Sequence, residues 1–233
     1  MFALVKMRKA IVVGLVVASA GAVAACGGQK KDDAAASPVV VTSARPTPTP
    51  LNDARAAAAL ATGGLGVKDM PGMRPLGAPI TTLNSPTVAG LCGTTAAGLT
   101  SEKLRMARRQ LVWSAGPSEF VSEERIVYQQ GGVQAALKDL LTSSTICPDR
   151  IGVRPVSSSA KLPAGSMEVS SHGTGQGGDS YAVPVGDRLL VVLWSNWTGS
   201  SGSAEPAVIR TALAKARTVV VQREQPTLQA LAG

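Results

Sequence analysis

Histidine and aromatic residues are scarce in this chain of 233 residues, which has one histidine, three tryptophans, two tyrosines and two phenylalanines. A zinc site is not expected, because structural zinc needs four Cys or His ligands in short paired spacings and the three cysteines stand far apart. No basic run is interleaved with aromatic residues, the pattern on which single-stranded nucleic acids stack. The sequence therefore predicts no metal, no cofactor and no nucleic-acid partner.

Positive charge is also limited. The formal net charge is +8, and Lys6, Arg8 and Lys9 of the N-terminal leader supply three of these charges, which leaves +5. The arginines at 105–109 are followed closely by glutamates at 119–124. The basic excess is therefore not gathered into a patch of the kind that binds polyanions.

The N-terminus has the three-part pattern of a secreted bacterial lipoprotein. A cationic segment at 7–9 is followed by an apolar run at 11–17 and by small residues that lead to the sequence Val-Ala-Ala-Cys ending at Cys26. The thiol can carry a diacylglyceryl group, and two or three acyl chains hold a protein firmly on a membrane. We therefore expect residues 1–25 to be a signal peptide and Cys26 to be lipidated, on the extracytoplasmic face of the cell membrane.

Two alternatives concern this leader. A transmembrane anchor needs about 20 apolar residues, whereas the run at 10–25 is shorter, rich in Gly and Ala, and followed by charges at 30–33. Translation from Met7 instead of Met1 is the second alternative, and it would leave the mature protein unaltered.

The two remaining cysteines, Cys92 and Cys147, are expected to form a disulfide, because disulfides persist in oxidising extracytoplasmic compartments. Closing a loop of about 55 residues stabilises a fold by roughly 4 kcal/mol in the chain-entropy account. The alternative is a pair of free buried thiols.

Composition divides the mature chain into three parts. Residues 26–50 begin with the lipidated cysteine and end in Arg-Pro-Thr-Pro-Thr-Pro, which predicts an extended tether. Residues 51–221 are the predicted folded domain, and residues 222–233 are expected to be a loose tail.

Spacing patterns in residues 51–221 predict strands and helices that are grouped rather than regularly alternated. Asn52 is a good N-cap for a helix that Gly63 and Gly64 end, and Pro206 suits the first turn of a last helix that runs to about Thr218. The other expected elements are strands at 107–113, 120–129, 167–171, 180–185 and 188–195, a helix at 133–144, and a mostly irregular segment at 66–84. This order predicts one α+β domain with an antiparallel β-sheet.

Short motifs within about residues 52–221 carry a family resemblance. They are Leu60 followed by Asp69–Met73, then Leu91–Gly93, Arg125–Tyr128, Cys147 with Pro148, Gly178–Ser180 and Val185–Asp187. With these motifs the chain resembles the actinobacterial extracellular sensor domains, which include the outer part of mycobacterial membrane Ser/Thr kinases of the PknH type and many free-standing lipoproteins. The resemblance implies a non-enzymatic α+β domain with a twisted antiparallel sheet, helices packed on it, a cleft and disulfides. The kinase sensor has two disulfides, whereas this chain can supply only one, and it contains no kinase domain.

His172, Asp179 and Ser180 are the residues from which a hydrolytic site could be built. A nucleophilic serine is often displayed in a Gly-x-Ser-x-Gly turn, and Ala182 stands where the second glycine would be. His172 lies in a glycine-rich stretch that is typical of an exposed loop. No catalytic residue is therefore predicted.

Glu123 and Glu124 are the remaining candidates for acid–base chemistry. Neighbouring residues of a strand point to opposite faces, so the two carboxylates cannot flank one substrate. They are expected to be solvated or paired with Arg125 and Arg108.

The tryptophans are better candidates for binding. Trp194 and Trp197 have opposite parity on a predicted strand, so one is expected to face the core and the other a surface or cleft. Trp113 and Trp194 are expected in the core. Trp197 is expected at the ligand or partner site, together with Asn196 and Tyr181, with core packing of Trp197 as the alternative.

These observations predict a lipid-anchored extracytoplasmic sensor or binding module without enzymatic activity, which presents a cleft to an envelope ligand or protein partner. One alternative is a carrier of lipids or cell-wall precursors, which would need a large apolar cavity. A secreted hydrolase is the other alternative, and it would need His172 within hydrogen-bond reach of a serine.

Overall fold

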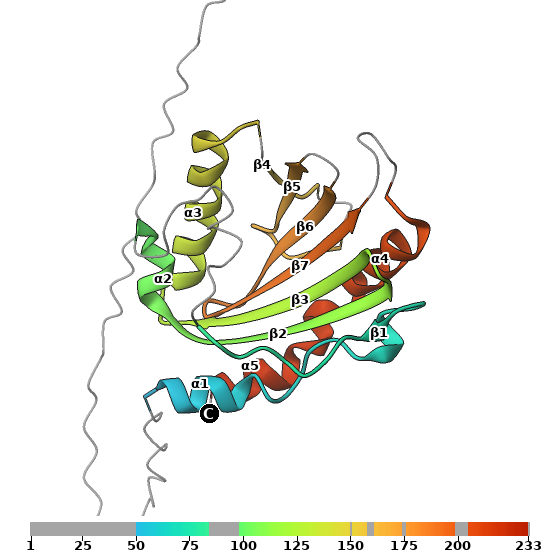
Figure 1. Ribbon diagram of the computed structural model, residues 1–233. Coiled ribbons are helices and arrows are strands. Elements are labelled where there is room, and N and C mark those ends of the chain that lie inside the picture. The colour runs from blue at the N-terminus through green and yellow to red at the C-terminus, as the bar shows by residue number, and fades with distance from the viewer. Residues whose placement is uncertain are drawn as a thin grey trace, which may run out of the picture. The chain divides into compact units, whose positions relative to one another are not determined.

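An antiparallel sheet organises the part of the chain that the computed structural model describes, which comprises residues 50–83, 98–149, 151–157, 161–173, 176–198 and 205–232 (Figure 1). The seven strands lie in the order β1-β2-β3-β7-β6-β5-β4. Their bounds are β1 Arg74–Pro75, β2 Arg105–Gly116, β3 Glu119–Tyr128, β4 Ile151–Pro155, β5 Met167–Gly173, β6 Gln176–Val185 and β7 Leu189–Thr198. Helices pack on both faces of this sheet, which confirms the predicted α+β fold.

The helices divide unequally between the two faces of the sheet. Their bounds are α1 Asp53–Ala59, the 3₁₀ turn η1 Val67–Asp69, α2 Thr100–Leu104, α3 Gly132–Ile146, α4 Ala207–Arg223 and α5 Gln225–Ala232. Helices α1, α4 and α5 lie on one side, which we name the α4 face, and α3 lies on the other, which we name the α3 face (Figure 1).

Strand order follows from one hairpin and one meander. Strands β2 and β3 form the predicted hairpin, and α3 then carries the chain to the far edge of the sheet. From β4 each strand pairs with the next until β7 returns to pair with β3. Strand β4 and helix α2 were not predicted, because each has only five residues and neither shows a full period of its pattern.

Alternation along the strands fills both faces with apolar side chains. On the α4 face the cluster includes Val121, Val191 and Leu193 together with Ile209 of α4. Ile126, Leu190 and Val192 pack on the α3 face against Val133, Leu137 and Leu140 of α3. Leu141, the residue after Leu140 on α3, is 42% exposed because it lies one position beyond the buried edge of the helix.

The C-terminal segment is folded, so the predicted loose tail at 222–233 is wrong. Helix α4 continues to Arg223, and α5 covers Gln225–Ala232 with Thr227 and Leu231 buried. Helix α5 lies beside α1 (Figure 1), and Arg55 of α1 donates hydrogen bonds to the carbonyls of Ala230 and Leu231, each at 3.4 Å. The folded domain therefore extends to Ala232.

The leader, Cys26 and residues 26–49 of the predicted tether lie outside the described residues. Among the helices that are described, none combines the length and the apolarity that a membrane-spanning helix requires.

Candidate functional site

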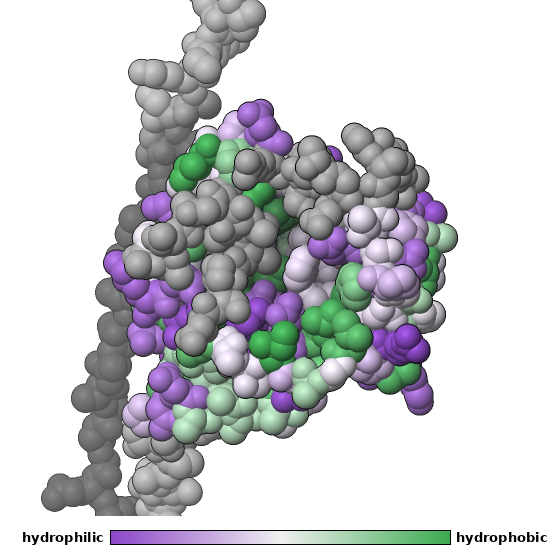
Figure 2. Space-filling view, viewed as in Figure 1, coloured by the Kyte–Doolittle hydropathy of each residue, from purple (hydrophilic) through white to green (hydrophobic). Residues whose placement is uncertain are grey.

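A small pocket opens on the part of the α3 face that lies beside the area covered by α3. It has a volume of about 150 Å³ and is lined by Val112 of β2, Phe120 and Ser122 of β3, and Trp194 and Asn196 of β7. We name it the Trp194 pocket. Ser122 is buried, whereas the other four side chains are half-buried. In Figure 2 hydrophobic side chains reach the surface near the middle of the face that is turned to the reader.

Strand register explains why a recess forms here. Trp194 is paired with Ser122 on β3 and with Ser180 on β6. Both flanking residues are small, so the indole has no bulky cross-strand neighbour at its own level. Phe120 and Asn196 form the next pair along β3 and β7, and they lie on the same face because two positions separate them from Ser122 and Trp194.

The indole of Trp194, which lines this pocket, carries a hydrogen-bond donor that no described residue uses. Its Nε1 atom is buried and has no hydrogen-bond partner among the described residues. Leaving a buried donor without an acceptor costs about 1–3 kcal/mol. A ligand oxygen that accepted a hydrogen bond from Nε1 would recover this cost.

A chain of polar contacts leads from a buried ion pair to the wall of the pocket. Arg108 pairs with Glu124 and donates from a terminal nitrogen to Oε1 of Gln110 at 2.7 Å. The amide nitrogen of Gln110 then donates to Oγ of Ser122 at 3.3 Å. Because Ser122 accepts this bond, its own O–H remains to be donated, and the pocket thus offers a second donor.

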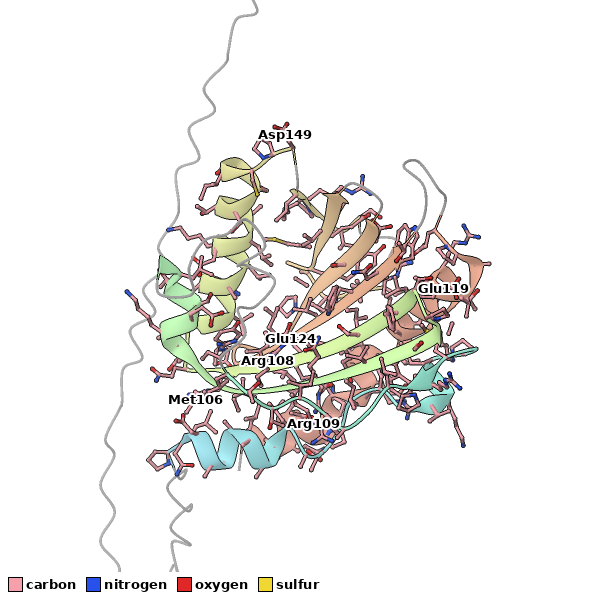
Figure 3. The ribbon with its side chains drawn as sticks, in the orientation of Figure 1. Met106, Arg108, Arg109, Glu119, Glu124 and Asp149 are labelled. Carbon is pink, nitrogen blue, oxygen red and sulfur yellow. The ribbon has the colours of Figure 1, made fainter. Side chains whose placement is uncertain are left out.

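The ion pair at the start of this chain is desolvated. Figure 3 shows Arg108 and Glu124 together on the side of the sheet that faces α3. Burial raises the pKa of Glu124, and the neighbouring Arg108 guanidinium opposes that rise. The predicted pairing of Glu124 with Arg108 is confirmed, but the carboxylate is buried rather than solvated.

The structure reverses the predicted roles of the two tryptophans of β7. Trp197 is only 9% exposed and belongs to the apolar cluster of the α4 face. Trp194, predicted to be core, lines the pocket. The parity argument is confirmed, and the assignment of the faces is wrong, because the more extensive helical cover lies on the α4 face. Trp113 is buried as predicted, at 2% exposure.

The other predicted binding residues are not brought together. Asn196 lines the Trp194 pocket. Tyr181 points to the opposite side, is 8% exposed, and packs in the cluster of the α4 face. Arg217 of α4 lies over its ring, 4.5 Å from the centroid. Tyr181 and Trp197 therefore do not belong to a site that contains Asn196.

Glu123 belongs to a buried charged cluster on the α4 face that includes Arg125, so of the two predicted alternatives, solvation or proximity to an arginine, the structure excludes solvation. The backbone N–H of Leu65 donates to both of its oxygens, at 3.0 and 3.1 Å. Burial raises the pKa of Glu123 to about 7, and the charge of Arg125 opposes this rise. Arg125 itself pairs with Glu224 at the end of α4.

Arg125 holds together segments that are far apart in the sequence. One terminal nitrogen donates to the carbonyl of Leu60 at 2.9 Å, and the other donates to Oγ1 of Thr227 at 2.6 Å. Glycine is required beside this cluster, because a Cβ on Gly63 would come within 2.4 Å of Oγ1 of Thr227 and its φ is +69°. The cluster fixes the ends of α1 and α4 on the sheet, which is a structural role.

Backbone register separates the residues considered for a hydrolytic site. His172 lies in β5, not in the predicted loop, and pairs with Gly177. Ser180 pairs with Val169 on the same ladder. The two positions are three pairs, or roughly 10 Å, apart along the strands, so the register does not bring them together.

Two further expectations concern cysteines and metals. Cys147 follows the last residue of α3 and is half of a disulfide whose partner lies outside the described residues. Cys26 and Cys92 both lie there, so the pairing of Cys92 with Cys147 stays a prediction. Within the described ranges, His, Cys, Asp and Glu side chains form no group of three that could hold a metal ion.

Sequence reasoning missed Trp194, Phe120, Ser122 and Val112 as members of one site. Their grouping depends on the register of β2, β3 and β7, which no local pattern encodes. The one feature of the sequence that pointed toward this site was the opposite parity of Trp194 and Trp197, which places their side chains on different faces of the sheet. Chemically, the pocket can hold a side-chain-sized or ring-sized group against aromatic surface and donate hydrogen bonds to it.

No protein-family model matches the chain, and neither does any of the curated proteins.

Proposed function

We propose that this chain is a lipid-anchored extracytoplasmic binding module that captures an envelope ligand or protein partner in the Trp194 pocket. The observation that carries the proposal is the half-buried Trp194 in a recess lined by apolar and small polar side chains, with an Nε1 that has no partner among the described residues. Ligand sites typically combine apolar walls with a few well-placed polar groups. The pocket has this composition on a rigid sheet.

Pocket size and charge define what part of a ligand would bind. A cavity of about 150 Å³ is comparable to one that accommodates a single benzene ring. The charged groups nearest in the polar chain, Arg108 and Glu124, are paired with each other. The captured group is therefore uncharged, of ring or side-chain size, and carries an oxygen that accepts from Trp194 or Ser122.

The anchoring part of the proposal rests on the N-terminal sequence. The leader that ends at Cys26 has the pattern of a lipoprotein signal, and the Pro- and Thr-rich stretch up to residue 50 would hold the domain away from the bilayer. A domain so placed is available to other components of the envelope.

The described hollows and the strand register favour binding over the two alternatives. A carrier of two-chain lipids or cell-wall precursors would need a large apolar cavity. The Trp194 pocket, of about 150 Å³, and a second described hollow on the other side of β2, of about 400 Å³, are both too small for such a cargo. A hydrolase built on His172 and Ser180 would need the two residues side by side, whereas their backbone positions are three pairs apart on the ladder of β5 and β6.

Trp194→Phe and Trp194→Ala test the proposal. The full-length protein and both variants are purified from their own envelope, and native mass spectrometry measures the fraction of molecules that carries a bound mass. We expect the Phe variant to lose part of this fraction, since it keeps the aromatic surface without the N–H, and the Ala variant to lose most of it.

Val67→Ala is the matched control, because Val67 is an apolar side chain that is 64% exposed and does not line the pocket. It should retain the bound fraction of the wild type. Equal bound fractions in Trp194→Ala and Val67→Ala, with both proteins folded, would remove the Trp194 pocket as the binding site.

A further inference from the structure

A second and larger hollow lies between α1 and β2, apart from the Trp194 pocket. Its volume is about 400 Å³, which falls within the range of small-molecule sites. One wall is formed by Ala54 and Ala57 of α1 and by Leu60, which follows the helix. Met106 and Ala107 form the facing wall. The remaining lining residues are Asp53, Thr81, Leu83, Arg108 and Arg109. We name this hollow the α1 pocket, and its walls are mostly aliphatic.

Arg109 is the group in this pocket whose charge no described residue compensates. Its side chain is half-buried, and no acidic side chain or hydrogen-bond acceptor among the described residues pairs with it. Figure 3 shows Met106 and Arg109 on the side of β2 that faces α1, whereas Arg108 lies on the other side with Glu124. A guanidinium in an apolar hollow is a ready partner for an anion, because its fork of donors fits a carboxylate or phosphate.

The neighbours of Arg109 explain why it has no partner in the described part of the chain. Across the ladder it is paired with Arg125, another cation, whose charge is taken up by Glu224. Glu123, on the same face of β3, accepts its hydrogen bonds from the backbone N–H of Leu65. The α1 pocket therefore has one net positive group along its inner wall, and the exposed Asp53 lies at its rim.

We propose that the α1 pocket binds a single-chain amphiphile with an anionic head group, such as a fatty acid or an alkyl phosphate. The head group is bound by Arg109, and the chain lies between the alanines of α1 and the Met106–Ala107 segment of β2. The volume admits one short chain, not the two chains of a membrane phospholipid. This site lies on the opposite side of β2 from the Trp194 pocket and does not depend on the function proposed above.

Calorimetric titration tests this proposal directly. The mature full-length chain with Cys26→Ser is used, so that no lipid of its own competes for the pocket. Decanoate and decyl phosphate are each titrated below the concentration at which they form micelles, and decanol is the uncharged probe. We expect at least one of the two anions to bind with one-to-one stoichiometry, and decanol to bind at least about tenfold more weakly, since it lacks the charge-assisted hydrogen bonds.

Substitutions of Arg109 and Asp53 separate the effect of charge on anion binding from the effect of the planar guanidinium geometry. Arg109→Gln should weaken anion binding about tenfold or more, and Arg109→Lys should restore part of it, because an ammonium keeps the charge and loses the fork. Asp53→Asn should leave binding intact or strengthen it, since it removes a negative charge from the rim. Trp194→Ala should have no effect.

A pair of tryptophan substitutions on α1 tests the location. Ala57→Trp places a large side chain in the pocket, whereas Ala58→Trp adds the same side chain at an exposed position of α1 that does not line it. Only the first should abolish binding. The proposal is overturned if neither anion binds, if decanol binds as tightly as the anions do, if Arg109→Gln binds like the wild type, or if Ala57→Trp and Ala58→Trp behave alike.

Discussion

Arg125 and Glu224 are 99 residues apart in the sequence, and in the fold their side chains form an ion pair with 2.8 Å between Nε and Oε1. The side chains are 1% and 0% exposed. A pair at this depth owes its stability to mutual neutralisation and to the extra hydrogen bonds that Arg125 makes, since desolvating two charges is costly. The pair therefore joins β3 to the junction of α4 and α5.

Glu224→Gln should lower the free energy of unfolding by about 3–5 kcal/mol, because it leaves the buried charge of Arg125 without its counter-ion. Urea denaturation followed by circular dichroism measures the change. Arg154→Ala is the control, since the pair between Arg154 and Glu168 lies at the surface and its loss should be barely measurable. If both variants are equally stable, the Arg125–Glu224 pair contributes nothing particular to the fold.

Stability should depend on the ionisation of Glu123. Burial raises its pKa to about 7 in the folded protein, from 4.5 for an ordinary glutamate, so between these pH values the folded state holds a proton that the unfolded state has lost. The free energy of unfolding should then fall as pH rises from about 4.5 to 7, by an amount on the order of 3 kcal/mol, and level off above. Glu123→Gln should remove this slope. A profile that is the same in wild type and variant between pH 4.5 and 7 would contradict the assignment.

Trp197→Ala should destabilise the domain far more than Trp194→Ala. Trp197 is buried in the cluster of the α4 face, where replacing tryptophan by alanine typically costs about 3–5 kcal/mol. Trp194 is half-buried beside an open recess, so the truncated side chain leaves a smaller void. Thermal unfolding of the two variants compares them, and a larger loss for Trp194→Ala would show that the two faces are assigned the wrong way round.

A disulfide between Cys92 and Cys147 should be found by peptide mapping without reductant. Cys147 already takes part in a disulfide, and a lipidated Cys26 has no thiol left to share, which leaves Cys92 as the partner. Replacing Cys92 and Cys147 together by alanine should lower stability by up to about 4 kcal/mol. A Cys26–Cys147 peptide in protein taken from the envelope would refute both the pairing and the lipidation.

Cys26→Ser should abolish acylation and leave uncleaved precursor, because lipoprotein processing begins with formation of the thioether on this sulfur. Incorporation of radiolabelled fatty acid and partitioning into detergent follow the two effects. Cys147→Ala is the control that should be labelled as the wild type is. Labelling of Cys26→Ser at the wild-type level would exclude lipidation at this residue.

The elements of the sheet could be predicted from the sequence wherever a full period of alternation was present. Strands β2, β3, β6 and β7 and helix α3 are confirmed close to their expected positions. Helix α5 could not be predicted, because its eight residues give a weak pattern and its position depends on Thr227 and Leu231 packing against distant parts of the fold. Local propensity does not contain that information.

The site was harder to predict than the fold, for a specific reason. Parity shows that Trp194 and Trp197 face opposite sides, but the choice of side depends on how much helix covers each face. Arg109 and Arg125 illustrate the same limit, because both are arginines on one face of a hairpin and only the tertiary structure supplies Glu224 to one of them.

The contact of α5 with α1 has a consequence for the order in which the molecule can assemble. Synthesis releases α1 first and α5 last, and β3 must wait for β7 before its second edge is paired. Folding is therefore dominated by contacts between segments distant in the chain, which is typical of slow folding. A chain shortened to Arg223, without α5, would expose the part of the α4 face that Leu228 and Leu231 cover, and it should therefore aggregate more readily while it folds.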